Sequence, residues 1–320
     1  MTALAGCHHA SGGGATDAGG GGSDASPAID APTSSVCGTR TGMRGKTSRT
    51  IHIGGLDRTY IVYLPQAVDP TMPIPLVMVF HGYTMSGDAM YGVTGYPAIA
   101  DSEHIALAFP DGEAGPNSSG APWNVGANVC PADDFITPPN ASGDDFALMD
   151  AIQADIANDQ CIDTAHVFAT GFSMGGYFSH HIGCMKPGIR AVAPHSGGTH
   201  TLDACINAHM PIIIFHGTGD PLVPDGCDDP NALLGVPNVT PSASEWAAHN
   251  GCGTTTTTVQ VDGGSCEVWN GCPVDGQVEL CTFTLMGHCW AGGQGNILYG
   301  CPTYASATQL EWDFFKTHAW

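Results

Sequence analysis

The stretch Cys161–Cys184 reads CIDTAHVFATGFSMGGYFSHHIGC and carries the strongest structural signal in this chain of 320 residues. Residues 166–170 are a short apolar run with valine and phenylalanine, which is typical of a buried strand. A Gly-x-Ser-x-Gly pattern follows over 171–175, and an apolar, helix-like segment continues through residue 182. Between a strand and a helix this pattern predicts a nucleophile elbow, in which Gly171 and Gly175 allow close backbone approach and the hydroxyl of Ser173 is exposed. The alternative, a glycine-rich turn with an ordinary serine, fits these flanking segments less well.

The charge of the chain argues against several classes of partner. Thirty acidic residues stand against eight basic ones, giving a formal net charge of −22. No Lys or Arg occurs between Arg190 and Lys316, and the small basic group at 40–49 is more simply a solvated edge. Because phosphate binding needs clustered cations, we expect no nucleic-acid partner. An anionic polymer would be repelled, whereas a neutral ester or polysaccharide would not.

Cysteine usage indicates an oxidising compartment. Thirteen cysteines are many for a reducing cytosol, and they lack a paired Cys-x-x-Cys metal pattern, so we expect disulfides in an extracytoplasmic protein. Leu4-Ala5-Gly6-Cys7 looks like a bacterial lipobox, in which Cys7 is lipidated and anchors the protein to a membrane. That interpretation leaves twelve cysteines for up to six bridges.

The N-terminal segment differs in composition from the rest of the chain. Only six residues precede Cys7, without a basic region or an adequate apolar region, so a real lipobox would mean a truncated or mis-assigned start. Residues 8–33 are rich in Gly, Ala, Ser and Asp and cannot bury a core. We predict a truncated signal and flexible tether over residues 1–35 and a single folded domain over residues 36–320.

Strand and helix patterns alternate along that domain, which predicts an α/β fold with a mostly parallel central sheet flanked by helices. Residues 111–142 are rich in Gly, Pro and Asn, and loops of that length usually serve a site. Apart from the segments in the elbow, we expect strands over 50–53, 58–64, 75–80, 105–109, 190–194, 211–215 and 278–286, and helices over 85–100, 144–157, 242–249 and 305–318.

Ser173 needs a base and a group that orients the base, because a serine hydroxyl is a poor nucleophile at neutral pH. In hydrolases with this elbow the chain order is serine, acid, histidine. Asp220 directly follows a predicted buried strand, at the sheet edge where open α/β folds place their sites. His288 follows the last predicted strand and is our candidate base. The weaker competitors are Asp225, Asp228, Asp229, His249 and His318.

The early strand that ends at His81-Gly82-Tyr83 fits the second half of an oxyanion hole. We expect the backbone N–H groups of Tyr83 and Met174 to stabilise a developing negative oxygen. The acidic segment at residues 225–229 does not favour a calcium site, because it lacks the glycine and the spacing of an EF-hand loop. We expect neither a metal nor a cofactor.

Taken together, these motifs resemble a family of secreted α/β-hydrolases that includes feruloyl esterases and polyhydroxybutyrate depolymerases. The resemblance covers most of residues 58–320 and rests on His81-Gly82, Trp123-Asn124, Asp144-Asp145, the elbow block, His216-Gly217-x-x-Asp220 and Gly287-His288.

The resemblance implies a disulfide-rich α/β-hydrolase catalytic domain that works as a serine carboxylesterase, with Ser173, Asp220 and His288 as the catalytic triad. It also implies a disulfide between Cys161 and Cys184. Tannase-like feruloyl esterases place a cysteine just before the serine to bond one beside the histidine. Here Phe172 takes that place, so Cys289 must pair elsewhere, for example with Cys301.

Trp123 and Trp290 are candidates to present flat faces to an aromatic acyl group or a polymer chain, although ordinary packing is an equal alternative. The implied partner is a neutral ester, either an aromatic ester of the plant cell wall or a polyester. Three alternatives would use the same triad: an acetylxylan esterase, a peptidase, and a polyester hydrolase of the cutinase type, which this chain resembles only locally. A non-catalytic surface binding protein on a hydrolase scaffold is the alternative from another class.

Overall fold

The computed structural model describes residues 37–113, 120–126, 144–199, 202–223, 239–293, 301 and 306–319. Cys37 begins a compact unit that extends to the C-terminus. Several residues singled out above lie outside the described part, namely Cys7, the predicted tether, Cys130, Cys227 and the acidic group at 225–229.

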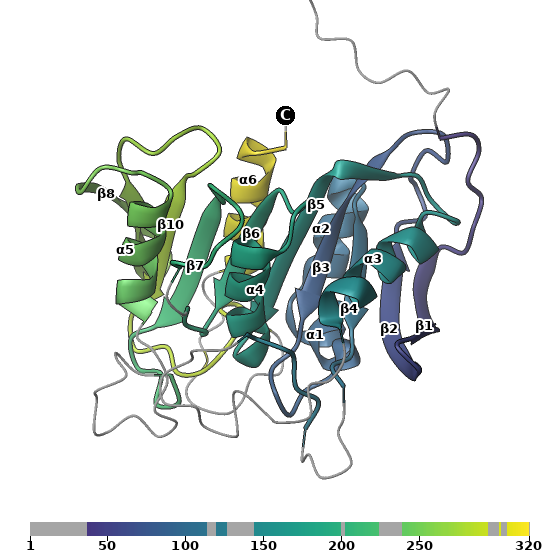
Figure 1. Ribbon diagram of the computed structural model, residues 1–320, viewed down its shortest axis with the longest axis horizontal. Coiled ribbons are helices and arrows are strands. Elements are labelled where there is room, and N and C mark those ends of the chain that lie inside the picture. The colour runs from purple at the N-terminus through teal and green to yellow at the C-terminus, as the bar shows by residue number, and fades with distance from the viewer. Residues whose placement is uncertain are drawn as a thin grey trace, which may run out of the picture. The chain divides into compact units, whose positions relative to one another are not determined.

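A ten-stranded sheet forms the centre of this unit, in the order β1-β2-β4-β3-β5-β6-β7-β10-β9-β8 (Figure 1). The six strands from β4 to β10 in this order are parallel, and antiparallel strands extend the sheet at both edges. The prediction of a mostly parallel sheet is therefore confirmed. The strands are β1 (Gly45–Ile53), β2 (Leu56–Leu64), β3 (Ile74–Phe80), β4 (Ala106–Pro110), β5 (Ile162–Phe172), β6 (Ala191–His195), β7 (Ile212–Gly217), β8 (Thr256–Val261), β9 (Gly264–Trp269) and β10 (Val278–Phe283).

Helices cover both faces of the sheet. On one face lie α3 (Asp145–Ile156), α4 (Met174–Met185) and α5 (Val239–His249), whose side chains share a core that includes Phe178 and Trp246. On the other face lie α1 (Gly87–Val93), α2 (Tyr96–Glu103) and α6 (Ala307–Thr317), with Tyr96 and Phe315 in the second core. The inner strands β3, β4, β6 and β7 are buried along their whole length, as expected for a parallel sheet between two helical layers.

Two regions differ from the sequence-based expectation. The helix expected over 85–100 is two helices, because Gly95 adopts a left-handed backbone with φ 73° and a proline opens α2. The hairpin of β8 and β9 was not expected at all. Its threonine-rich first strand is exposed on nearly every residue, so it lacks the alternation by which a half-buried strand is recognised.

Five disulfides stabilise the described residues, and one of them corrects a prediction. Cys161 pairs with Cys37, and Cys184 pairs with Cys205, so the expected bond between Cys161 and Cys184 is wrong. Cys161 directly precedes β5 and Cys184 lies in the last turn of α4, and each cysteine pairs with a segment outside the strand–elbow–helix unit. The expected bond between Cys289 and Cys301 is present.

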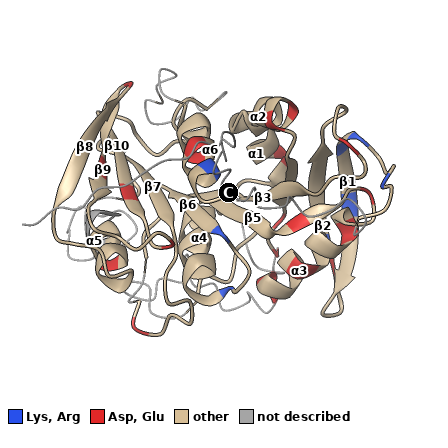
Figure 2. Cartoon of the chain, turned by 90° about the horizontal axis from the view of Figure 1, so that it is seen from above, with Lys and Arg blue, Asp and Glu red and all other residues tan. Residues whose placement is uncertain are grey.

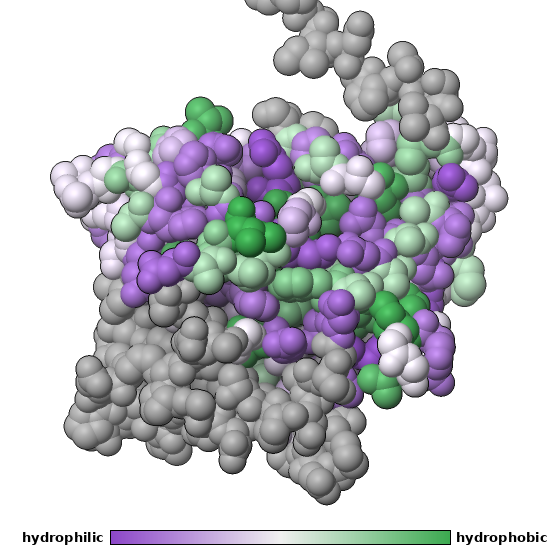
Figure 3. All heavy atoms as spheres, viewed as in Figure 1, coloured by the Kyte–Doolittle hydropathy of each residue, from purple (hydrophilic) through white to green (hydrophobic). Residues whose placement is uncertain are grey.

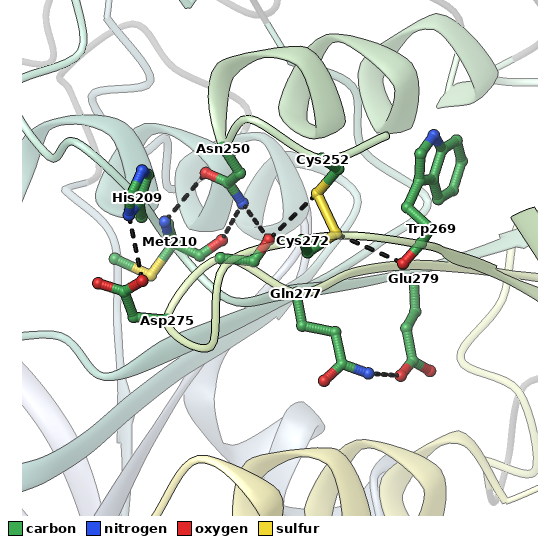
Figure 4. Close-up of a disulfide and its surroundings, with 10 residues drawn as sticks. His209, Met210, Asn250, Cys252, Trp269, Cys272, Asp275, Gln277 and Glu279 are labelled. Atoms are coloured by element: carbon green, nitrogen blue, oxygen red, sulfur yellow. Dashed lines mark hydrogen bonds and ion pairs between the residues drawn. A yellow bond between two sulfur atoms is a disulfide. The ribbon is translucent and has the colours of Figure 1, made fainter. Parts of the chain in front are cut away.

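The two remaining bridges stabilise the antiparallel edge beside β10. Cys266 and Cys281 are register partners on β9 and β10 and are bonded across the two strands. Cys252, just beyond α5, is bonded to Cys272 beyond β9, next to the Asn250 amide that binds the Met210 backbone (Figure 4). Disulfides of this number are typical of an oxidising, extracytoplasmic environment.

The surface has no free basic patch within the described residues. Arg49 of β1 pairs with Asp155 and Asp159 of α3, and Lys46 pairs with Asp88 of α1, so Figure 2 shows basic and acidic residues together near β1. Polar and apolar residues are mixed over the face in Figure 3. None of the described helices has the length and apolar character needed to cross a membrane. The described residues also contain no group of three His, Cys, Asp or Glu side chains suited to a metal ion.

Candidate active site

The elbow forms where the sequence places it. β5 ends at Phe172, α4 begins at Met174, and Ser173 between them has φ 56° and ψ −116°. Non-glycine residues rarely adopt this backbone conformation, which costs about 1–3 kcal/mol of strain energy. Such strained residues are typical of functional sites. A Cβ at Gly175 would lie 2.2 Å from the Phe80 carbonyl oxygen, and one at Gly171 would lie 2.4 Å from that of Gly175. The reason inferred for both glycines, close backbone approach, is therefore confirmed.

Asp220 and His288 meet at the carboxyl ends of β7 and β10. His288 Nδ1 lies 2.7 Å from Asp220 Oδ2, and the other carboxylate oxygen accepts the N–H groups of Leu222 and Val223 at 2.9 and 3.0 Å. Burial alone would raise the pKa of Asp220, but the hydrogen bond and charge of His288, together with His216 and the Val223 N–H, hold that pKa below its usual value. An ionised Asp220 keeps the proton of His288 on Nδ1, which leaves Nε2 free to accept one.

Backbone contacts fix the acid loop against the histidine loop. Thr218 N–H donates to the Phe283 carbonyl at 3.0 Å, and Gly219 N–H donates to that of Met286 at 2.9 Å. A Cβ at Gly217 would lie 2.2 Å from the Met286 oxygen, so only glycine fits there. The bond between Asp220 and His288 therefore rests on two rigidly joined strand ends.

The residue before the serine contacts the candidate base. The ring of Phe172, the residue before Ser173, lies 4.7 Å from the His288 ring, measured between centroids. The competing histidines lie elsewhere: His249 binds the Asn207 carbonyl, and His318 follows α6. The competing aspartates at 225–229 lie outside the described residues.

Residues 81–83, which we call the oxyanion segment, lie against the elbow. A Cβ at Gly82 would be 3.2 Å from Ser173 Cβ. His81 Nε2 accepts the Gly112 N–H at 2.9 Å, so Nδ1 carries the ring proton and donates to the Gly82 carbonyl at 2.7 Å. Burial lowers the pKa of His81, which favours this neutral ring. The roles expected of the Tyr83 and Met174 N–H groups remain predictions.

The two tryptophans considered as substrate contacts are core residues. Trp123 is fully buried, donates to the His81 carbonyl at 2.9 Å and stacks on Phe178. Trp290 is 1% exposed, donates to Thr308 Oγ1 at 2.9 Å and stacks on His195. Both indoles are covered by other side chains, which agrees with the alternative of ordinary core packing. Their burial does not support the expected substrate contact.

Sequence reasoning missed a polar cluster behind the elbow. The backbone carbonyl of His195 accepts the Ser173 N–H at 2.9 Å. The Nε2 atom of the His195 ring lies 2.8 Å from Glu311 Oε2 of α6. The Tyr96 hydroxyl donates to the other oxygen of Glu311. All three side chains are buried. Their positions, 96, 195 and 311, give no local pattern, although a glutamate among the apolar residues of the last helix was a visible anomaly.

Comparison with known proteins supports the resemblance. No protein-family model matches the chain. Feruloyl esterase B of Piromyces equi is 29% identical over 269 residues, which are 81% of this chain and 45% of that protein. A probable feruloyl esterase C of Aspergillus terreus is 30% identical over 230 residues, which are 65% of this chain and 76% of the relative. The chain belongs to the feruloyl esterase family.

Solved structures agree with this family at the level of the fold. An acetyl xylan esterase from Aspergillus awamori superposes with a TM-score of 0.60 at 15% identity, over 85% of this chain and 99% of that chain. The chain therefore has the α/β-hydrolase fold of this family. The chain spans less than half the length of the Piromyces relative, so its own activity, substrate and partners are matters of proposal.

Proposed function

We propose that this protein is an extracytoplasmic serine carboxylesterase that cleaves esters through an acyl-enzyme, with Ser173, His288 and Asp220 as its triad. The observation that carries the proposal is the 2.7 Å contact between His288 and Asp220 on two joined strand ends, beside a strained serine on the neighbouring elbow. Because the pKa of the Asp220 carboxyl group is lowered, this group is suited to orient and stabilise an imidazolium. Family membership supports the same chemistry.

The reaction follows from these groups. Ser173 Oγ attacks the ester carbonyl carbon while His288 Nε2 takes its proton, and Asp220 stabilises the positive ring. The N–H groups of Tyr83 and Met174 hold the tetrahedral oxygen anion. The alcohol leaves with the proton from His288, and water then hydrolyses the acyl-enzyme by the same route, restoring Ser173. No cofactor enters any of these steps.

For the substrate we propose an aromatic ester of the feruloyl type, because the relatives that match over most of this chain are named feruloyl esterases. The acidic chain suits a neutral ester. The lipid anchor at Cys7 remains a prediction of the sequence.

One comparison of substrates tests both parts of the proposal. We would measure kcat/KM on methyl ferulate, p-nitrophenyl acetate and a soluble 3-hydroxybutyrate oligomer, with Ser173→Ala as the blank. Turnover by the alanine variant at the wild-type rate would refute the triad. Preference for the oligomer or the acetate over methyl ferulate would leave the triad standing and replace the substrate class with a polyester or an acetyl ester.

A further inference from the structure

A buried ion pair lies between β2 and α3. Arg58 Nη2 donates to Asp145 Oδ1 at 2.8 Å, and the two side chains are only 4% and 3% exposed. Desolvation offsets much of the attraction in such a pair, so it contributes little net stability compared with apolar packing. Its effect is better sought in the geometry that it fixes.

The remaining hydrogen bonds of this pair go to the backbone of one loop. Arg58 Nη2 also donates to the Asp111 carbonyl at 3.1 Å, and Asp145 Oδ2 accepts the Asn124 N–H at 2.8 Å. Residues 111–113 and 120–124 are joined to each other, since Glu113 N–H donates to the Pro122 carbonyl at 3.2 Å. We call these two segments the bracing segments. The ion pair binds both of them.

The bracing segments in turn hold the oxyanion segment at three points. Gly112 N–H donates to His81 Nε2 at 2.9 Å, and Trp123 Nε1 donates to the His81 carbonyl at 2.9 Å. Ala121 N–H donates to the Tyr83 carbonyl at 3.0 Å. A continuous path of hydrogen bonds therefore leads from the ion pair to both sides of Tyr83. Ala121 holds the Tyr83 carbonyl, and the peptide that carries the Tyr83 N–H is held through the Gly82 carbonyl, which accepts His81 Nδ1–H at 2.7 Å.

We propose that Arg58 and Asp145 are positioning residues for ester hydrolysis, which act through the bracing segments to aim the Tyr83 N–H at the oxyanion. The inference rests on the function proposed above. Loss of one oxyanion donor typically costs about 10²–10³ in turnover, and a misplacement of about 1 Å can cost about 10². Such donors stabilise the transition state more than the bound substrate, so the effect should appear in kcat rather than in KM.

Asp145→Asn is the sharpest perturbation. The site requires two acceptors, one for Arg58 and one for the Asn124 N–H, whereas the amide offers one acceptor and one donor in nearly the same volume. One of the two bonds is therefore lost whichever way the amide turns. We expect kcat for p-nitrophenyl acetate to fall roughly 10- to 100-fold, with KM changed by less than about twofold.

Asp155→Asn provides the matched control. Asp155 lies on the same helix and binds Arg49 of β1 at 2.8 Å and the Tyr60 hydroxyl. Among the described residues, Asp155 has no hydrogen bond to either bracing segment. The variant therefore removes the charge of an ion pair on α3 without disturbing the bracing segments. We expect its kcat to stay within about twofold of wild type, once each preparation is normalised by active-site titration.

A tetrahedral analogue separates positioning from mere loosening of the fold. An aryl trifluoromethyl ketone adds to Ser173 and places an oxygen anion in the oxyanion hole. Its Ki should rise in Asp145→Asn by the same factor as kcat/KM falls, while the Kd for the aryl carboxylic acid stays unchanged. Equal kcat and equal Ki in Asp145→Asn and Asp155→Asn would overturn the inference.

Trp123→Phe is the second variant, needed if Asp145→Asn does not fold. It removes the bond to the His81 carbonyl together with part of the ring that packs on Phe178. It should show the same split between kcat and KM, and wild-type kcat and Ki would contradict the proposal. Failure of the proposed function itself has a different signature, which is retained turnover in Ser173→Ala.

Discussion

Replacing Glu311 with glutamine should change how the stability of this protein depends on pH. Glu311 is fully buried, accepts the Tyr96 hydroxyl and lies 2.8 Å from His195 Nε2. Burial raises the pKa of Glu311 well above its ordinary value of 4.5, against the opposing hydrogen bonds of Tyr96 and Thr170. Burial likewise lowers the pKa of His195 well below its ordinary value, so burial favours the neutral form of both groups.

The sign of the effect follows from proton counts. Above pH 4.5 the unfolded chain loses the Glu311 proton while the folded protein keeps it, so the folded state binds more protons. Its contribution to stability is complete below pH 4.5 and is lost as the pH rises towards the folded pKa. Each pH unit in that window costs about 1.4 kcal/mol of unfolding free energy. Glutamine has no proton to lose. The unfolding free energy of Glu311→Gln, relative to that of wild type, should therefore rise by about that amount for each pH unit in the window.

Urea unfolding with the disulfides intact, followed by tryptophan fluorescence from pH 4 to 8, measures this difference. Glu267→Gln is the control, because Glu267 is only half-buried and accepts two threonine hydroxyls, which lower its pKa. Its small contribution has the opposite sign, since it is present above pH 4.5 and is lost as the pH falls. A Glu311→Gln difference that stays constant from pH 4 to 8 would refute the reasoning, because it would mean that Glu311 titrates normally in the fold.

Three further substitutions test the site. Asp220→Asn should lower kcat by about 10³–10⁴ with folding intact, because the amide no longer holds His288 in the required tautomer; steady-state kinetics that show a loss below tenfold would contradict the assigned acid. Gly175→Ala should destabilise the protein by about 3 kcal/mol or more, because the new Cβ would lie 2.2 Å from the Phe80 oxygen, and an unchanged Tm would disprove that close approach. Cys289→Ser removes the disulfide to Cys301, whose sequence separation is 12, and should lower the unfolding free energy in a denaturant titration by roughly 3 kcal/mol. The variant should also have a lower kcat, because Cys289 adjoins His288. Full activity would show that the disulfide does not hold the histidine.

The parts of the fold that local chemistry dictates were predictable from sequence. The elbow could be placed because its glycines meet specific backbone atoms, and Asp220 and His288 could be placed because parallel strands bring their carboxyl ends to one edge. The unexpected hairpin had one overlooked signal, the Asp262-Gly263 turn between β8 and β9. Its exposed threonines gave no periodicity to support that turn.

Contacts between distant segments were not predictable in the same way. Cys161 had several possible partners in sequence, and the choice of Cys37 depends on where the first described residues pass the base of β5. The roles of Trp123 and Trp290 depended on whether their loops turn inward, which no local pattern specifies. Arg58 and Asp145 are 87 residues apart, so their pairing across the fold is likewise a property of the tertiary structure.

The bridge between Cys37 and Cys161 also determines how the domain would carry a mechanical load. A pull on the chain before Cys37 would pass through this covalent bond to the start of β5, rather than along the backbone to the edge strand β1. Peeling β1 from β2 breaks hydrogen bonds one after another, whereas β5 is held on both sides by β3 and β6 and would have to be sheared from both at once. Tension therefore enters the sheet at an interior strand, at the end opposite Ser173, and bypasses the hairpin of β1 and β2.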